Sequence, residues 1–181
     1  TSHFRLFAAL RPLSFIVAAT TSFLAFVPLA QANPHILVDV QTGRVLEHEE
    51  DFRKWYPASL TKLMTVYTVF DAIRAGQISL DTPVVMSKRA AAQPAAKMYF
   101  KPGQKLTLDS ALKILMVKSA NDIAVAVAEA IGGTQEGFVT RMNGEALKLG
   151  MTDSHFVNPN GLPGKGQYTT ARDLAVLTVA L

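Results

Sequence analysis

The fold of this chain is decided by residues 57–76, whose sequence is PASLTKLMTVYTVFDAIRAG. Apolar side chains recur along this stretch at helical spacing, and Gly76 provides a typical stop, so we predict one helix from Ser59 to about Ala75. Apolar side chains cover two sides of this helix, and only a narrow strip of three threonines is polar. We therefore expect a central helix that is buried on most of its circumference.

Ser59 and Lys62 are three residues apart on the predicted helix. Side chains at that spacing project from neighbouring positions, with Cβ atoms roughly 5–6 Å apart, so the lysine amine can reach the serine hydroxyl. Lys62 is the only charged residue between Ser59 and Phe70, and an unpaired lysine is costly to bury unless it is neutral. A neutral lysine can take the serine proton, and backbone N–H groups at the helix start could hold an oxyanion. The pattern indicates a nucleophile and its base.

A second Ser-x-x-Lys match, Ser110 and Lys113, shows that the spacing alone is not specific. Composition predicts roughly one such match by chance in a chain of this length. The second pair faces away from the apolar stripe of its own predicted helix, so we expect it on a solvated surface. For Ser59, a purely structural interpretation as the N-cap of its helix remains open.

The short break Ser119-Ala120-Asn121 separates two further apolar helices. A hydroxyl and an amide at alternate positions of a tight connection can point into one cleft. There Ser119 can relay a proton, and Asn121 can bind a substrate carbonyl or steady the lysine. Alternatively, either residue simply caps the following helix.

The rest of the chain predicts an α+β fold, with an antiparallel sheet packed against a helical cluster. His35–Val40 and Arg44–His48 are expected to form a hairpin joined by a turn. Residues 86–103 are expected to make a long excursion over the body of the protein. The further predicted helices cover Thr107 to about Val117, Asn121–Ile131, Thr134–Leu149 and a last segment that starts at Thr170.

The first 32 residues have the character of a secretory leader. Two arginines precede a largely uncharged stretch, residues 13–29, and Ala30-Gln31-Ala32 supplies the small-x-small pattern that signal peptidase accepts. We predict a signal peptide over residues 1–32, with an uncleaved membrane anchor as the alternative. In both cases the remaining residues are expected to work outside the cytoplasm.

Composition narrows the function further. The 181 residues include no cysteine and carry 18 Lys+Arg against 14 Asp+Glu, a net charge of +4. With no basic cluster, no zinc-type Cys/His pattern and no ligand spacing among the four histidines, neither nucleic acid nor a metal is expected as a partner. Chemistry on a peptide or small molecule is the better expectation.

Two motifs in order, Pro57–Thr65 and Lys118–Asp122, resemble the low-molecular-mass penicillin-binding D-alanyl-D-alanine carboxypeptidases, whose superfamily carries Ser-x-x-Lys. The likeness covers essentially all of residues 33–181. It implies a β-lactamase/transpeptidase-like fold in which these residues form the N-terminal part of the catalytic domain. The cleft would lie between the sheet and the helical cluster.

By this resemblance, Ser59 is acylated by the penultimate D-alanine of a peptidoglycan stem peptide, with Lys62 as base, and terminal D-alanine is released. Water then hydrolyses the ester, while Ser119 and Asn121 assist proton transfer and substrate binding. β-Lactams, which mimic the D-alanyl-D-alanine end, are expected to trap Ser59 as a slow ester. Acyl transfer needs no cofactor, and the resemblance implies a periplasmic or wall-facing bacterial protein.

One departure from the family pattern is important. The third motif of the family, Lys-Thr-Gly on a strand, does not occur in this sequence. The resemblance implies that this motif lies beyond Leu181, together with the C-terminal strands and the membrane-binding segment of many relatives. The activity of the chain as it stands is therefore left open.

The same residues allow three alternatives to a carboxypeptidase. A class A β-lactamase is disfavoured, because Ala120 stands where that class has Asp and residues 151–162 contain no glutamate for rapid deacylation. A D,D-endopeptidase that cuts peptidoglycan cross-links would use the same residues. A non-catalytic penicillin-binding or wall-binding module also remains open.

Overall fold

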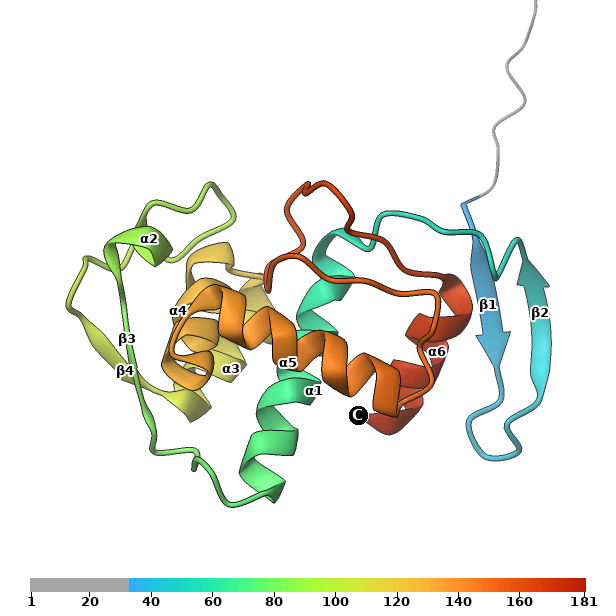
Figure 1. The fold of residues 1–181 in the computed structure, drawn as a ribbon, viewed down its shortest axis with the longest axis horizontal. Coiled ribbons are helices and arrows are strands. Elements are labelled where there is room, and N and C mark those ends of the chain that lie inside the picture. Colours follow the sequence, from blue (N-terminus) through green and yellow to red (C-terminus); the bar gives the residue numbers. More distant parts are fainter. Residues whose placement is uncertain (1–32) are drawn as a thin grey trace, which may run out of the picture. The chain divides into compact units, whose positions relative to one another are not determined.

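Helix α4 (Asn121–Gly132) lies at the centre of the fold, with most of its side chains buried. The computed structural model describes residues 33–181, and the predicted leader lies outside them. Helix α4 packs against helix α3 (Leu108–Lys118) and helix α5 (Gln135–Lys148), in agreement with the predicted helical cluster. Figure 1 shows this cluster beside helix α1, with one small sheet at each end of the molecule.

Helix α1 (Thr61–Arg74) confirms the predicted central helix, with one correction at its start. Ser59 lies not in the α-helix but in a preceding 3₁₀ turn, Ala58–Leu60. The N–H of Leu60 donates to Pro57 O at 3.1 Å, the three-residue bond of a 3₁₀ turn, and Ala58 within this turn has a left-handed φ of 45°. At the other end Gly76 stops the helix as predicted, with a φ of 69°.

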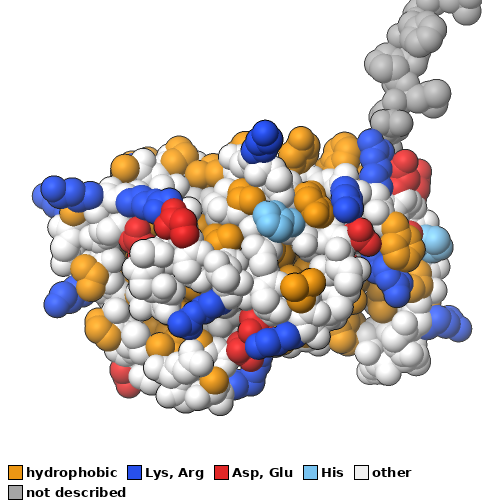
Figure 2. Space-filling view, viewed as in Figure 1, with side chains coloured by type: hydrophobic (Ala, Val, Ile, Leu, Met, Phe, Trp, Pro, Cys, Tyr) orange, Lys and Arg blue, Asp and Glu red, His pale blue; other side chains and the backbone are white. Residues whose placement is uncertain are grey.

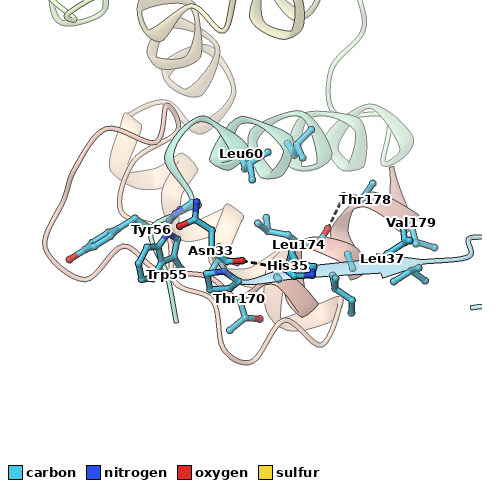
Figure 3. A pocket seen from close by; sticks show the side chains of 18 of the residues that line it. Asn33, His35, Leu37, Trp55, Tyr56, Leu60, Thr170, Leu174, Thr178 and Val179 are labelled. Carbon is cyan, nitrogen blue, oxygen red and sulfur yellow. Dashed lines mark hydrogen bonds between the residues drawn. The ribbon is translucent and has the colours of Figure 1, made fainter. Parts of the chain in front are cut away.

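The predicted N-terminal hairpin is present. Strand β1 (His35–Val38) pairs antiparallel with strand β2 (Val45–Glu49). Helix α6 (Ala171–Ala180) packs on β1, and an apolar groove of about 570 Å³ runs between β1, α6 and the start of α1. In Figure 3, Leu60, from the 3₁₀ turn before α1, and Leu174, from α6, face this groove.

A second antiparallel pair was not predicted. Strand β3 (Pro83–Val85) pairs with strand β4 (Lys105–Thr107), and the predicted excursion of residues 86–103 connects them. This excursion contains the short helix α2 (Lys88–Ala91), which packs on α4. Three-residue strands are too short to show a period-2 pattern, so they cannot be predicted from side-chain alternation.

Threonines begin three of the helices, as expected. The hydroxyls of Thr107, Thr134 and Thr170 accept hydrogen bonds from the backbone N–H three residues later, at the starts of α3, α5 and α6. On the surface in Figure 2, acidic, basic and apolar side chains are interspersed without a large field of one charge. Among residues 33–181, no helix has the length and apolar character needed to cross a membrane.

Candidate active site

Lys62 is the centre of the candidate site. It lies in the first turn of α1, and its side chain is almost completely buried, with 3% of the residue exposed. Its Nζ lies 3.2 Å from Ser59 Oγ, which confirms that the amine reaches the hydroxyl. Ser59 itself is exposed, so a ligand can approach its hydroxyl from solvent.

Two further oxygens complete the surroundings of the Lys62 amine. Asn121 Oδ1 lies 3.0 Å from Nζ, and the backbone oxygen of Asn160 lies 2.6 Å away. Neither oxygen carries a negative charge, so the ammonium form loses its hydration without gaining a counter-ion. Burial accordingly lowers the pKa of Lys62 from 10.5 to about 8. At pH 7 about a tenth of the amines are then neutral, whereas an ordinary lysine has far fewer.

Asn121 is held in one orientation at the start of α4. Its Nδ2 donates to the backbone oxygen of Pro94 at 3.2 Å, which leaves Oδ1 to face Lys62. The N-cap of α4 is Ala120, and no side chain caps this helix end. Asn121 therefore does not serve as a cap. Its amide instead connects Lys62 with the backbone of Pro94, in the excursion of residues 86–103.

Ser119 lies two residues before Asn121, at the C-cap of α3, and it is half-buried. Its φ of 52° is left-handed, which is uncommon for a serine and turns the chain from α3 into α4. Within residues 33–181, no hydrogen bond involves its hydroxyl. The structure thus places Ser119 in the connection beside Asn121 but does not join it to Ser59 or Lys62.

The structural interpretation of Ser59 as a helix cap does not hold. Neither the 3₁₀ turn nor α1 has a side-chain hydrogen bond at its N-cap. Among the described residues, the backbone N–H of Ser59 has no hydrogen-bond partner either. The N–H of Ser59 is therefore available to bind an oxyanion, as predicted for the helix start, although it belongs to the 3₁₀ turn and not to the α-helix.

Sequence reasoning missed the contribution of the segment between residues 158 and 161. Besides the Asn160 oxygen on Lys62, the Pro159 oxygen accepts a hydrogen bond from Thr65 Oγ1 at 2.7 Å. Gly161, with a φ of 82°, lies so close to the 3₁₀ turn before α1 that a Cβ would be 1.8 Å from Ala58 O. The only sequence signal was the turn-rich composition of this stretch, which indicates a turn but not its partner.

The arrangement around Lys62 suits a base. A neutral amine has two hydrogens and one lone pair, while Asn121 Oδ1 and Asn160 O can only accept hydrogen bonds. In the ammonium form, Nζ donates to Ser59 Oγ as well as to these two oxygens; in the neutral form the two oxygens accept both hydrogens, and the lone pair is left for the Ser59 hydroxyl. The geometry can therefore withdraw the serine proton and activate Oγ as a nucleophile.

Comparison with known proteins agrees with this geometry. The sequence model of the D-alanyl-D-alanine carboxypeptidase family, peptidase S11, matches residues 22–181. The chain belongs to this family. It is 40% identical over 160 residues to the D-alanyl-D-alanine carboxypeptidase DacC of Escherichia coli K12, an overlap of 85% of this chain and 40% of DacC.

Solved structures of this family are also similar. The D-alanyl-D-alanine carboxypeptidase DacD from Francisella tularensis superposes with a TM-score of 0.79 at 41% identity, over 81% of this chain and 36% of that chain. Penicillin-binding protein D2 from Listeria monocytogenes, in its cefotaxime-bound form, gives a TM-score of 0.72 at 27% identity, over 82% and 60%. These neighbours confirm the predicted fold class. The chain spans about 40% of the length of the curated relatives that it matches.

Proposed function

We propose that this chain carries the acylation machinery of a serine-type D-alanyl-D-alanine carboxypeptidase. The observation that carries the proposal is the buried Lys62, whose Nζ lies 3.2 Å from Ser59 Oγ and whose pKa burial lowers to about 8. Membership of the D-alanyl-D-alanine carboxypeptidase family supports the same activity. The substrate is a peptidoglycan stem peptide that ends in D-alanyl-D-alanine.

The proposed reaction has two steps. Lys62 takes the proton of Ser59 while Oγ forms a bond to the carbonyl carbon of the penultimate D-alanine. The bond from that carbon to nitrogen then breaks, and the amine of terminal D-alanine leaves with a proton. In the second step, water attacks the ester on Ser59 and releases the shortened peptide. Both steps are acid–base chemistry and need no cofactor.

Ser119 and Asn121 have supporting roles in this proposal. Asn121 steadies the amine of Lys62 and carries an amide next to the substrate position. Ser119 relays the proton from Lys62 to the leaving amine, a role supported by its place in the α3–α4 connection. The hydrogen bonds around Ser59 and Lys62 involve no carboxylate within residues 33–181, which is consistent with slow hydrolysis of a β-lactam ester.

The location of the protein is part of the proposal. Residues 1–32 act as a signal peptide, so that residues 33–181 belong to the catalytic domain and reach the periplasm or wall-facing side of a bacterial membrane. This is where peptidoglycan stem peptides occur. N-terminal sequencing of the exported protein is expected to begin at Asn33, whereas a start within residues 1–32 contradicts cleavage after Ala32.

Labelling with a fluorescent penicillin tests the proposed function. β-Lactams are expected to acylate Ser59, a reaction supported by the cefotaxime-bound form of the Listeria neighbour. Protein expressed from the complete gene should be labelled and should release D-alanine from a peptide ending in D-alanyl-D-alanine. Both signals should vanish in Ser59→Ala and persist in the matched control Ser110→Ala. A wild-type protein without labelling, or a labelled Ser59→Ala variant, contradicts the proposal.

A further inference from the structure

A second pocket lies directly beside the nucleophile. It has a volume of about 580 Å³, and we call it the Lys165 pocket. One wall consists of the residues just before Ser59, and the other is the loop that follows Asn160. The lining residues are Tyr56, Pro57, Ala58, Gly161, Leu162, Pro163, Gly164, Lys165 and Gln167.

We propose that the Lys165 pocket binds a side chain of the peptide substrate that carries a carboxylate on an aliphatic stem. This inference rests on the proposed function, because it assigns part of the same substrate. Lys165 provides the opposite charge, and the prolines, Ala58 and Leu162 provide apolar walls for the stem. The pocket thus determines which stem peptides the protein prefers. This role is separate from that of the residues that perform the reaction.

The position of the pocket follows from contacts already described. Ala58 immediately precedes Ser59, and Gly161 lies against the Ala58 backbone so closely that any Cβ would overlap it. On the other side of Gly161, Asn160 O accepts a hydrogen bond from Lys62. One loop therefore holds the base and forms the pocket wall, so a substrate on Ser59 has its neighbouring residues within reach of this wall.

The loop is fixed by a network beneath it. Gln167, with only 4% of its surface exposed, accepts hydrogen bonds through Oε1 from the backbone N–H groups of Val157 at 3.0 Å and Asn158 at 3.3 Å. Its Nε2 donates to Leu162 O at 3.3 Å, and Asn158 Nδ2 donates to the same oxygen at 2.8 Å. The wall is therefore formed before substrate arrives, which reduces the entropic cost of binding.

The charge of the pocket selects its ligand. Lys165 is the only charged residue among those that line it, and no acidic residue takes part. Three described lysines form ion pairs with carboxylates, among them Lys54 with Asp153 and Lys148 with Glu145, whereas others such as Lys105 form none. Lys165 forms no such ion pair within residues 33–181. Positive charge over apolar walls complements an aliphatic carboxylate better than a cationic or fully apolar side chain.

Two matched substrates test the inference. Both are acylated Lys-D-Ala-D-Ala tripeptides, and the lysine ε-amine is acetylated in one and succinylated in the other, so only the second has a terminal carboxylate. The wild-type protein, expressed from the complete gene, should favour the succinylated peptide about fivefold in kcat/KM, as expected for a partly exposed ion pair. The preference should fall at 0.5 M salt.

Variants assign the preference to Lys165. Lys165→Gln should abolish it and Lys165→Glu should reverse it, whereas Lys105→Gln, on exposed β4, should leave it unchanged. An equal rate on both peptides in the wild-type protein, or a preference that survives Lys165→Gln, overturns the inference while penicillin labelling of Ser59 stands. Absence of that labelling and of turnover on both peptides overturns the proposed function itself, and the inference with it.

Discussion

Two serine–lysine pairs with the same spacing lie in this chain, and their surroundings differ completely. In the pair Ser59–Lys62, the lysine is 3% exposed and its Nζ has three oxygen neighbours. In the pair Ser110–Lys113, the lysine side chain is 73% exposed and forms an ion pair with Asp109 at 2.7 Å. The sequence prediction of a solvated second pair is confirmed.

The difference shows that the spacing in sequence only brings the amine within reach of the hydroxyl. The neighbours in the tertiary structure set the pKa of the amine. Lys113 keeps a charged partner, Asp109, and its side chain stays in contact with water. Lys62 loses water and gains only uncharged acceptors, which lowers its pKa to about 8. We therefore expect an activated hydroxyl beside Lys62 and none beside Lys113.

The largest effect is expected from removing the amine of each pair. Lys62→Met keeps the stem but removes the base, so acylation by labelled penicillin should slow by a factor on the order of 10⁴ or more. Lys113→Met, the matched change on the surface, should leave the rate within about twofold. Rapid-mixing measurements of label incorporation check both, and equal rates in the two variants would contradict the difference between the pairs.

A smaller effect is expected from moving the loop that holds Lys62. In Gly161→Ala, the new Cβ would overlap Ala58 O, so the loop and the Ser59 turn must separate. A displacement of about 1 Å at a reacting group can cost roughly a hundredfold in rate, and we expect a loss of that size in acylation.

Gly150→Ala is the control for this change. Gly150 has a similar φ of 78° but open space around the position of a Cβ. Its substitution should cost about 1 kcal/mol of stability through the backbone alone and leave acylation intact. Thermal unfolding of both variants distinguishes a loss of overall stability from a local displacement at Lys62. Full activity in Gly161→Ala would show that the loop does not position Lys62.

The smallest expected effect is the dependence of acylation on pH. Because the folded-state pKa of Lys62 is lowered, the neutral base is scarce below about pH 8 and predominates above it. The acylation rate should therefore rise about tenfold between pH 7 and pH 9 and then level off. A rate that is flat over this range, or that falls, would show that neutral Lys62 is not the base.

Much of the fold was predictable because it depends on local patterns. The helical spacing of apolar residues located α1, and a threonine marked the start of α3, α5 and α6. The strands of the β3–β4 pair were not predictable, because each is three residues long and gains its stability from the partner strand. The 3₁₀ turn at Ser59 was missed for a similar reason, since a left-handed alanine has no sequence signature.

The candidate site shows the same division. Ser59, Lys62 and Asn121 were identified from motifs, and the structure brings them together. Asn160 was not identified, because it acts through its backbone oxygen, which every residue possesses. Ser119 was placed in the correct connection, while its part in proton transfer stays a prediction.

The sequence by itself determined the central helix, the hairpin and the one-turn distance between an alcohol and an amine, since these follow from side-chain periodicity along a single segment. The sequence also indicated that the second pair is solvated, but only the tertiary structure decided which oxygens surround the buried amine of Lys62. That outcome depends on the burial of Lys62 and on oxygen atoms of Asn121 and Asn160, which follow it by 59 and 98 positions in the chain. Desolvation is a property of the packed molecule, and no local pattern encodes it.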